Sequence, residues 1–156
     1  MKDLLIRRYK PSDCEDSAKL FYNTIHAVNA KDYTGEQLNA WASGSENLEK
    51  WNRSLIKNTA FVAILNELMV GFGDIDETGY FDRLFVHKDH QREGIASVLC
   101  EKLEQTVQEG IITVHASITA KPFFEKRGYE VVQVQRAERR GMYLTNYLMS
   151  YSRHDR

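Results

Sequence analysis

The sequence is poor in cysteine. Its 156 residues include only two, Cys14 and Cys100, and no Cys-x-x-Cys motif is present. Cys100 falls on the apolar side of an expected helix, which favours a buried thiol over a disulfide or a nucleophile. The composition therefore offers neither a disulfide framework nor a redox motif.

Long apolar runs and an excess of one charge are also missing. No segment approaches the roughly 18 apolar residues that cross a bilayer, and residues 1–9 are too short and too charged for a signal peptide. The 21 basic and 22 acidic residues give a formal net charge of −1, which provides no electrostatic reason to bind nucleic acid or an anionic membrane. We expect a cytoplasmic protein with neither as a partner.

Repeats, low-complexity tracts and linkers are absent as well, so we expect a single domain over residues 1–156, with 42% apolar residues. Hydrophobic patterning predicts strands at Leu4–Tyr9, Ala60–Leu65, Met69–Ile75, Gly79–Val86, Ile111–Ala116, Tyr129–Gln135 and Met142–Tyr151. Helices are predicted from Ser12 to Val28, from Thr34 to Trp41, after Ser45, from Gly94 to Glu109 and after Pro122. The crossover helix makes the strands at Gly79–Val86 and Ile111–Ala116 parallel.

The segment that follows Leu84-Phe85-Val86 has the form of an anion site. A polar loop leads to Gln91-Arg92-Glu93-Gly94-Ile95-Ala96, which opens directly into a helix. The first N–H groups of a helix lack internal partners and carry positive potential. Gly94 allows close approach of a ligand, and Arg92 adds a positive charge. The loop histidines lack partners at ligand spacing, so no metal site is predicted.

This hexapeptide resembles the acyl-CoA pyrophosphate loop, Gln/Arg-x-x-Gly-x-Gly/Ala, of the GNAT acetyltransferases. Residues 117–129 resemble the second signature of that family, Ala-x-x-Phe-Tyr-x-x-x-Gly-Phe. Phe124 replaces the common Tyr, and Ser117 stands where many members carry Asn. Residues 33–42 and 116–125 are similar to a YafP-like bacterial branch of the family.

The resemblance implies an α/β fold, with a mostly antiparallel sheet that contains one parallel, splayed strand pair and is flanked by helices. It also implies an N-acetyltransferase that uses acetyl-CoA and no metal, with direct attack by a primary amine. The residues implied in binding acetyl-CoA are Leu84, Phe85, Val86, Gln91, Arg92, Glu93, Gly94, Ile95, Ala96, Ser97, Ser117, Phe123 and Phe124.

Proton transfer needs a base and, for the departing thiolate, a source of a proton. We expect Asp82 to be the base, because it lies on the strand that carries the donor contacts. The alternative is that Asp82 is a solvated aspartate or forms a salt bridge near Arg83. It shares a side with Leu84 and Val86 if the strand has no bulge. His115 and His26 are alternatives, although a His in an apolar strand is commonly a core residue. Tyr143, with Tyr147 beside it, is the candidate acid in place of the missing Tyr.

The acceptor is predicted to be a small, cationic, partly aromatic amine. The residues expected to bind it are Tyr22, His26, Tyr33 and Trp41, with Asp74, Asp76, Glu77 and Asp82 as a bordering acidic cluster. The alternative is that the aromatic residues belong to the core and the acidic residues to a solvated turn. Two alternatives stay open: acetylation of protein lysines or N-termini, and a silent acyl-CoA-binding module. The chain is expected to be a monomer or a homodimer.

Overall fold

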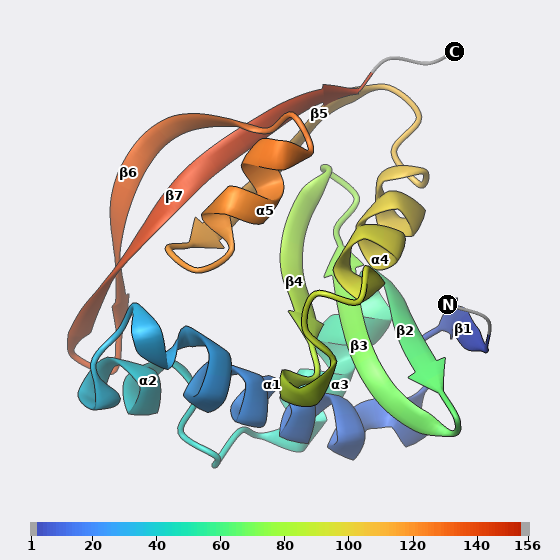
Figure 1. Cartoon of the computed structure of the whole chain (residues 1–156), viewed down its shortest axis with the longest axis horizontal. Helices are drawn as coiled ribbons and strands as arrows, with labels where there is room; N and C mark the ends of the chain where they lie inside the picture. Colours follow the sequence, from blue (N-terminus) through green and yellow to red (C-terminus); the bar gives the residue numbers. More distant parts are fainter. Residues whose placement is uncertain (1–2, 154–156) are drawn as a thin grey trace.

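A computed structural model describes residues 3–153 (Figure 1). The strands are β1 (Leu4–Arg8), β2 (Thr59–Leu65), β3 (Leu68–Ile75), β4 (Tyr80–Val86), β5 (Gly110–Ser117), β6 (Glu130–Arg139) and β7 (Met142–Arg153). The α-helices are α1 (Cys14–Val28), α2 (Gly35–Trp41), α3 (Leu48–Lys57), α4 (Ile95–Glu104) and α5 (Lys121–Lys126). Short 3-10 turns are η1 (Pro11–Asp13), η2 (Asn29–Lys31) and η3 (Lys88–His90).

The strands form one seven-stranded sheet in the order β1-β2-β3-β4-β5-β7-β6. Every neighbouring pair is antiparallel except β4 and β5, which are parallel. The mixed sheet with one parallel pair confirms the fold class expected from the sequence.

Two apolar cores lie on opposite faces of the sheet. Helices α1, α2 and α3 cover one face, whereas α4 and α5 cover the other (Figure 1). Ile25, Leu55 and Phe72 belong to the first core, and Leu99 and Met149 belong to the second. Each helix therefore presents its apolar stripe to the sheet, as amphipathic spacing requires.

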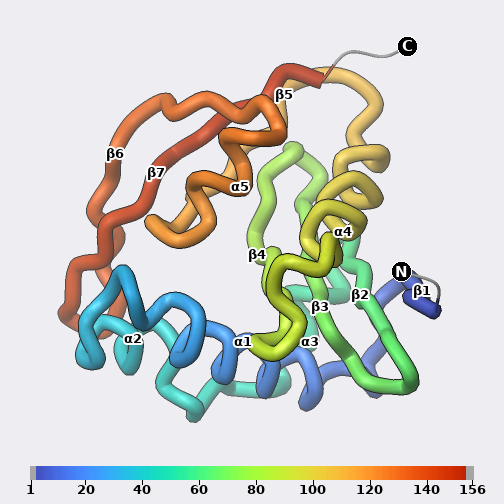
Figure 2. Tube along the Cα trace, in the orientation of Figure 1, coloured from blue at the N-terminus to red at the C-terminus, as the bar shows by residue number. Residues whose placement is uncertain are grey.

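The parallel strands β4 and β5 separate soon after they meet. Only Tyr80 with Thr113 and Phe81 with Val114 are paired. Beyond these residues the strands diverge, and the traces of β4 and β5 run apart in Figure 2. The main chain of β4 after Phe81 thus has no strand partner on its β5 side, which is the splay that the sequence analysis expected.

A β-bulge interrupts β4 at the start of this splay. Ile75 pairs with Phe81 and Asp74 pairs with Arg83, so Asp82 is the extra residue of β4. A bulge shifts the alternation of side chains by one position. Consequently Phe81 and Leu84 contact the same core. The expectation for a regular strand, with Asp82 on the side of Leu84 and Val86, is wrong for this reason.

Local capping explains the helix boundaries. The capping box of Thr34 and Gln37 is present at the start of α2, as predicted. Asn47, rather than Ser45, caps α3 by accepting from the main-chain N–H of Lys50 at 3.0 Å. α1 begins at Cys14 after a 3-10 turn, with Asp13 rather than Ser12 at its N-cap position.

α4 ends at Glu104, which is earlier than the predicted Glu109. The N–H groups of Thr106 and Val107 bond three residues back, to Leu103 and Glu104, and this 3-10 pattern tightens and closes the last turn. Over residues 3–153, no helix is both long enough and apolar enough to cross a membrane.

Candidate active site

A cleft of about 300 Å³ opens where β4 and β5 diverge. Its walls come from β4, β5 and the β6–β7 hairpin, and from the helical layer of α1, α2 and α3. Of the residues that the sequence analysis proposed for the site, eight line it: Tyr33, Trp41, Asp82, Leu84, Phe85, His115, Ser117 and Phe124.

Residues 91–96, called the glycine loop below, lie at the start of α4, next to the end of β4. Gly94 occupies the N-cap position of α4 with φ of +86°, in the left-handed region that favours glycine. A Cβ at Gly94 would meet no atom within 4 Å, so the space in front of it is open. Among residues 3–153, no side chain caps α4, and the first N–H groups of a helix have no internal acceptors. This arrangement suits a phosphate.

Other loop residues hold the loop in shape. Arg92 adopts φ of +61°. Alternation of residues of positive φ with residues of negative φ directs successive main-chain N–H groups to one side of the chain. His90 Nδ1 and Glu93 Oε1 lie 3.1 Å apart. The side chains of Val86 and Ile95 are buried in the core, so a ligand can contact only the main chain of these two residues.

Phe124 belongs to an aromatic cluster beneath the cleft. It is 3% exposed. Its ring packs against those of Phe81, Phe123 and Tyr129, with centroid separations of 6.0, 5.2 and 5.0 Å. Phe123 supports this cluster and is not among the cleft residues. Ser117 has a local role, because its Oγ accepts from the N–H of Ala120 at 3.0 Å and so fixes the entry to α5.

Three polar side chains gather where the splay begins. Asp82 is 44% exposed. Tyr80 and His115 face each other across the strands, with ring centroids 5.3 Å apart, and both line the cleft with Asp82. Burial, reinforced by the charge of Asp82, raises the pKa of Tyr80. His115 is exposed and is not a packed core residue, which makes it available for proton transfer.

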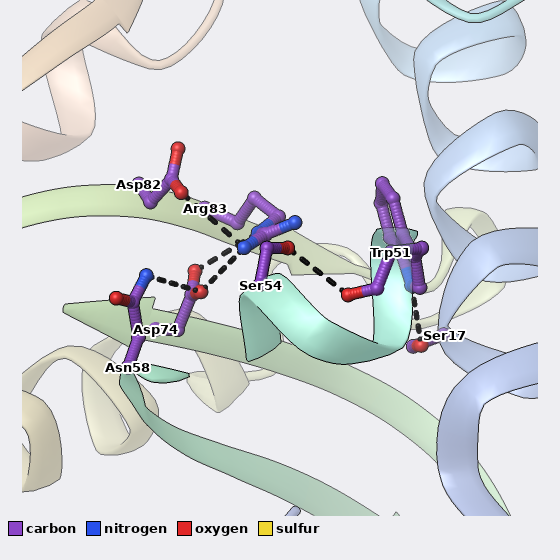
Figure 3. Close-up of polar contacts among 7 residues, drawn as sticks. All are labelled: Ser17, Trp51, Ser54, Asn58, Asp74, Asp82 and Arg83. Carbon is purple, nitrogen blue, oxygen red and sulfur yellow. Dashed lines mark hydrogen bonds and ion pairs between the residues drawn. The ribbon is translucent and has the colours of Figure 1, made fainter. Parts of the chain in front are cut away.

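Arg83 connects Asp82 to a buried carboxylate (Figure 3). Its guanidinium makes two hydrogen bonds to Asp74, of 3.0 Å from Nε and 2.6 Å from Nη2, and one of 3.2 Å from Nη2 to Asp82. Burial lowers the pKa of Arg83. The hydrogen bonds to Asp74 and the negative charge of Asp74 raise this pKa by more, so the pKa of Arg83 lies above its ordinary value. Burial raises the pKa of Asp74, and the bonds from Arg83 oppose this effect. The paired geometry favours the charged form of both.

The acidic cluster expected at the cleft is dispersed. Asp74 is buried and paired with Arg83. Asp76 folds back on its own turn, where Oδ1 accepts from the N–H groups of Thr78 and Tyr80. Of the four expected carboxylates, only Asp82 lines the cleft.

Tyr143 does not reach the cleft. Its neighbour Leu144 faces the core under α1–α3, and side chains alternate along a strand, so Tyr143 points to the opposite face. It is 52% exposed, and the guanidinium of Arg136 lies 4.4 Å from its ring. Tyr147 likewise carries a cation, Lys121, on its ring at 5.1 Å.

Tyr22 and His26 also lie outside the cleft. They are one helical turn apart on α1, so their rings pack against each other, with centroids 4.2 Å apart and planes tilted by 34°. His26 Nε2 is 2.7 Å from the main-chain oxygen of Ala42. Tyr22 lines a separate groove with Gly44 and Leu48. Tyr33 and Trp41 are therefore the two expected acceptor residues that the fold brings to the cleft.

The sequence analysis missed several cleft residues. Arg83, Tyr80, Trp51 and Asn146 all line it, and within residues 3–153 the buried Oδ1 of Asn146 has no hydrogen-bond partner. One signal was available: Asp74 is the single charge in an otherwise apolar strand, which demands a buried partner. In the part of the chain that the structure describes, no group of three or more metal-binding side chains gathers.

Strand order, splay and glycine loop together define the fold of the GCN5-related N-acetyltransferases. The crystal structure of such an enzyme from Rhodopseudomonas palustris matches with a TM-score of 0.91 and 32% identity, covering 95% of this chain and 94% of that one. The PaiA N-acetyltransferase of Thermoplasma acidophilum, solved with coenzyme A, shares the fold with a TM-score of 0.75 and 15% identity, covering 96% and 98%.

Sequence similarity to known proteins shows the family to which the chain belongs. Residues 29–151 match the family described as "Acetyltransferase (GNAT) domain". The chain is 39% identical over 151 residues to the uncharacterized N-acetyltransferase YafP of Escherichia coli strain K12, covering 97% of each. The chain belongs to the GNAT acetyltransferase family. It is an acetyltransferase, and acetyl-CoA is its co-substrate, as the sequence analysis expected.

Proposed function

We propose that the chain moves the acetyl group of acetyl-CoA to a primary amine of a small molecule. The observation that carries this proposal is the cleft where β4 and β5 diverge, which is lined by aromatic side chains of the helical layer. The glycine loop follows the end of β4, which forms one wall of this cleft, and leads into α4. A volume of about 300 Å³ suits a small acceptor.

The donor would bind along the splay. Its pyrophosphate would lie on the N–H groups of residues 92–97, where Arg92 and the helix dipole of α4 supply positive potential. The pantetheine arm, which carries the acetyl group, would follow the unpaired edge of β4 from Val86 to Leu84. Within β4, a main-chain N–H beside the thioester oxygen would stabilise the developing negative charge.

The acceptor would enter from the helical side. Tyr33 and Trp41 form an edge-to-face pair with centroids 5.5 Å apart. The hydroxyl of Tyr33 donates to the main-chain oxygen of Thr145 at 2.6 Å and accepts from the N–H of Ile118 at 2.9 Å. This wall is thus fixed to β7 and to the residue that follows β5, and it suits an apolar or aromatic body. The Asp82 carboxylate would attract the ammonium.

In the reaction, Asp82 takes a proton from the ammonium, and the neutral amine attacks the thioester carbon. The C–S bond breaks as the amide forms, and CoA leaves as a thiolate. Free thiols have a pKa of about 8.5, so water can supply the final proton. This fits the apolar Phe124 and the distance of Tyr143 from the cleft.

The test is an assay of free CoA, detected with a thiol reagent, over a panel of primary amines and peptides. Phenethylamine represents the aromatic amines, spermidine the polyamines, and a lysine-containing peptide and a peptide with a free N-terminus the protein substrates. We expect amine-dependent release that is greatest for a small apolar or aromatic amine. Preference for the peptides would replace the proposal with protein acetylation. Tight binding of acetyl-CoA with no turnover on any acceptor would indicate a silent module.

A further inference from the structure

Arg83 lies between two carboxylates of very different exposure. Asp74 is 0% exposed, the Arg83 side chain is 10% exposed, and Asp82 faces the cleft. The same atom, Nη2 of Arg83, donates to Oδ2 of Asp74 and to Oδ2 of Asp82 (Figure 3). One nitrogen therefore joins a carboxylate of the interior to the carboxylate proposed as the base.

We infer that Arg83 is a positioning residue, which holds the Asp82 carboxylate at the start of the splay, and that Asp74 anchors Arg83. The inference rests on the proposed function, in which Asp82 accepts the proton of the acceptor. Asp82 needs such support because, as the extra residue of the bulge, it has no partner on β3. Within residues 3–153, the bond from Arg83 is the one that the Asp82 side chain receives.

Residues of β3, α3 and α1 hold Arg83 in place. Asp74 on β3 also accepts from Nδ2 of Asn58, just after α3, at 3.0 Å. The guanidinium lies over the ring of Trp51 on α3, 5.0 Å from its centroid. Nε1 of Trp51 in turn donates to Oγ of Ser17 on α1 at 2.9 Å. Because the guanidinium is fixed from both sides, its contact with Asp82 is formed before a substrate arrives.

Charge supports a positioning role rather than an anion site. Two carboxylates share one guanidinium, so the group retains a net negative charge, and Asp82 is its exposed member. A substrate anion would meet that charge, whereas an ammonium would be attracted to it. Arg83 thus serves the acceptor through Asp82.

A merely structural ion pair would stabilise the fold without acting on Asp82. The chain offers a matched control of this kind in Arg7 and Asp13. Two nitrogens of Arg7 donate to the two carboxylate oxygens of Asp13 at 2.8 and 2.9 Å, and neither residue lines the cleft. Arg7→Lys therefore repeats the chemical change of Arg83→Lys away from the reacting groups.

The experiment is a double-mutant cycle on the full chain, with acetyl-CoA and the best amine of the panel above. Arg83→Lys keeps the charge but cannot make the forked contacts. We expect it to lower kcat by about 10-fold or more, with the Kd for acetyl-CoA changed by less than about 2-fold. In the Asp82→Asn background the same change should lower kcat by no more than about 2-fold, because the group on which Arg83 acts is already lost. Arg7→Lys should leave kcat unchanged.

Three outcomes would overturn the inference: equal losses from Arg83→Lys in both backgrounds, no loss in either, or an equal loss from Arg7→Lys. If Arg83→Lys does not fold, the pair Asp74→Asn/Arg83→Gln removes the charges but keeps hydrogen-bonding groups, and the same dependence on Asp82 is expected. Absence of turnover by the unaltered chain would instead refute the proposed function.

A crystal structure of Arg83→Lys tests the inference without any acceptor. We expect the Asp82 carboxylate to leave its place beside the cleft or to lose defined density. An unmoved and ordered Asp82 would overturn the positioning role, whatever the chain acetylates.

Discussion

The side chain of Gln91 donates from Nε2 to the main-chain oxygen of Val86 at 2.8 Å. The same oxygen accepts from Oγ1 of Thr24 at 2.9 Å, so α1, the end of β4 and the glycine loop meet at one atom. The first residue of the loop motif therefore sets the shape of the loop. Its side-chain donor is already committed to the main chain, so the proposed contact with a phosphate falls to the N–H groups that follow.

Gly94→Glu is expected to abolish binding of acetyl-CoA. The substitution places bulk and negative charge in the open space where phosphates are proposed to lie. Calorimetry with acetyl-CoA measures the effect. Gly141→Glu is a matched control, because Gly141 also has a positive φ, of +80°, and a Cβ there also meets no atom within 4 Å. Equal affinity of the Gly94 variant and the unaltered chain would refute the site assignment.

Asp82→Asn is expected to lower kcat by about 100-fold or more, the usual range for loss of a general base. The affinity for acetyl-CoA should hardly change, since the carboxylate acts on the acceptor. His115→Gln, made for comparison, should lower kcat by less than about 10-fold. Steady-state kinetics on both variants decide between the two bases. The reverse order of effects would assign the role to His115.

Phe124→Tyr is expected to change kcat by less than about 3-fold, because a CoA thiolate can leave without a side-chain acid. The added hydroxyl enters a buried aromatic cluster, so the free energy of unfolding should fall by about 1 kcal/mol. Phe123→Tyr, at a partly buried neighbour outside the cleft, serves as the control. An increase in kcat of about 10-fold or more would show that the missing hydroxyl limits the reaction.

Trp41→Ala is expected to raise the KM for the acceptor while the Kd for acetyl-CoA stays the same. The indole lines the cleft beside Tyr33, so its loss removes apolar contact with the body of the amine. Tyr22→Ala removes an aromatic ring from the same helical layer outside the cleft and should leave KM unchanged. Similar effects of both variants on KM would contradict a specific role of Trp41.

Asp13→Asn is expected to lower the free energy of unfolding at neutral pH by about 2 kcal/mol. Burial raises the pKa of Asp13, but hydrogen bonds from Arg7 and from the N–H of Lys10 lower it by more, so the pKa lies below the ordinary value. A lowered folded-state pKa stabilises the protein above about pH 4, and this contribution disappears as the pH falls through that pKa. Denaturant unfolding from pH 7 to pH 2 should show the two curves converging in acid. A constant difference would refute the linkage, and Asp16→Asn, at an exposed carboxylate of α1, is the control.

Features that depend on neighbouring residues could be predicted from the sequence. Thr34 and Gln37 lie three residues apart, and that spacing alone makes a capping box. The strand Leu84-Phe85-Val86, the glycine loop and the start of α4 occupy consecutive positions, so the local pattern and its resemblance to the family are contained in one segment. The parallel arrangement of β4 and β5 also follows, because a helical crossover joins them.

Relationships across the sheet could not be predicted in this way. The bulge at Asp82 depends on which residues of β3 pair with β4, and it decides which side each β4 residue faces. Tyr143 lies outside the cleft because the pairing of β7 turns it to the opposite face, a distinction of one residue that strand patterning does not resolve. The partnership of Asp74 with Arg83 joins residues nine positions apart on two strands, and burial rather than spacing made it necessary. The sequence by itself determined the family, the order of elements and the loop at α4, because these rest on local residue patterns. The tertiary structure alone decided which side chains meet at the cleft, because register and burial are set by contacts between distant segments.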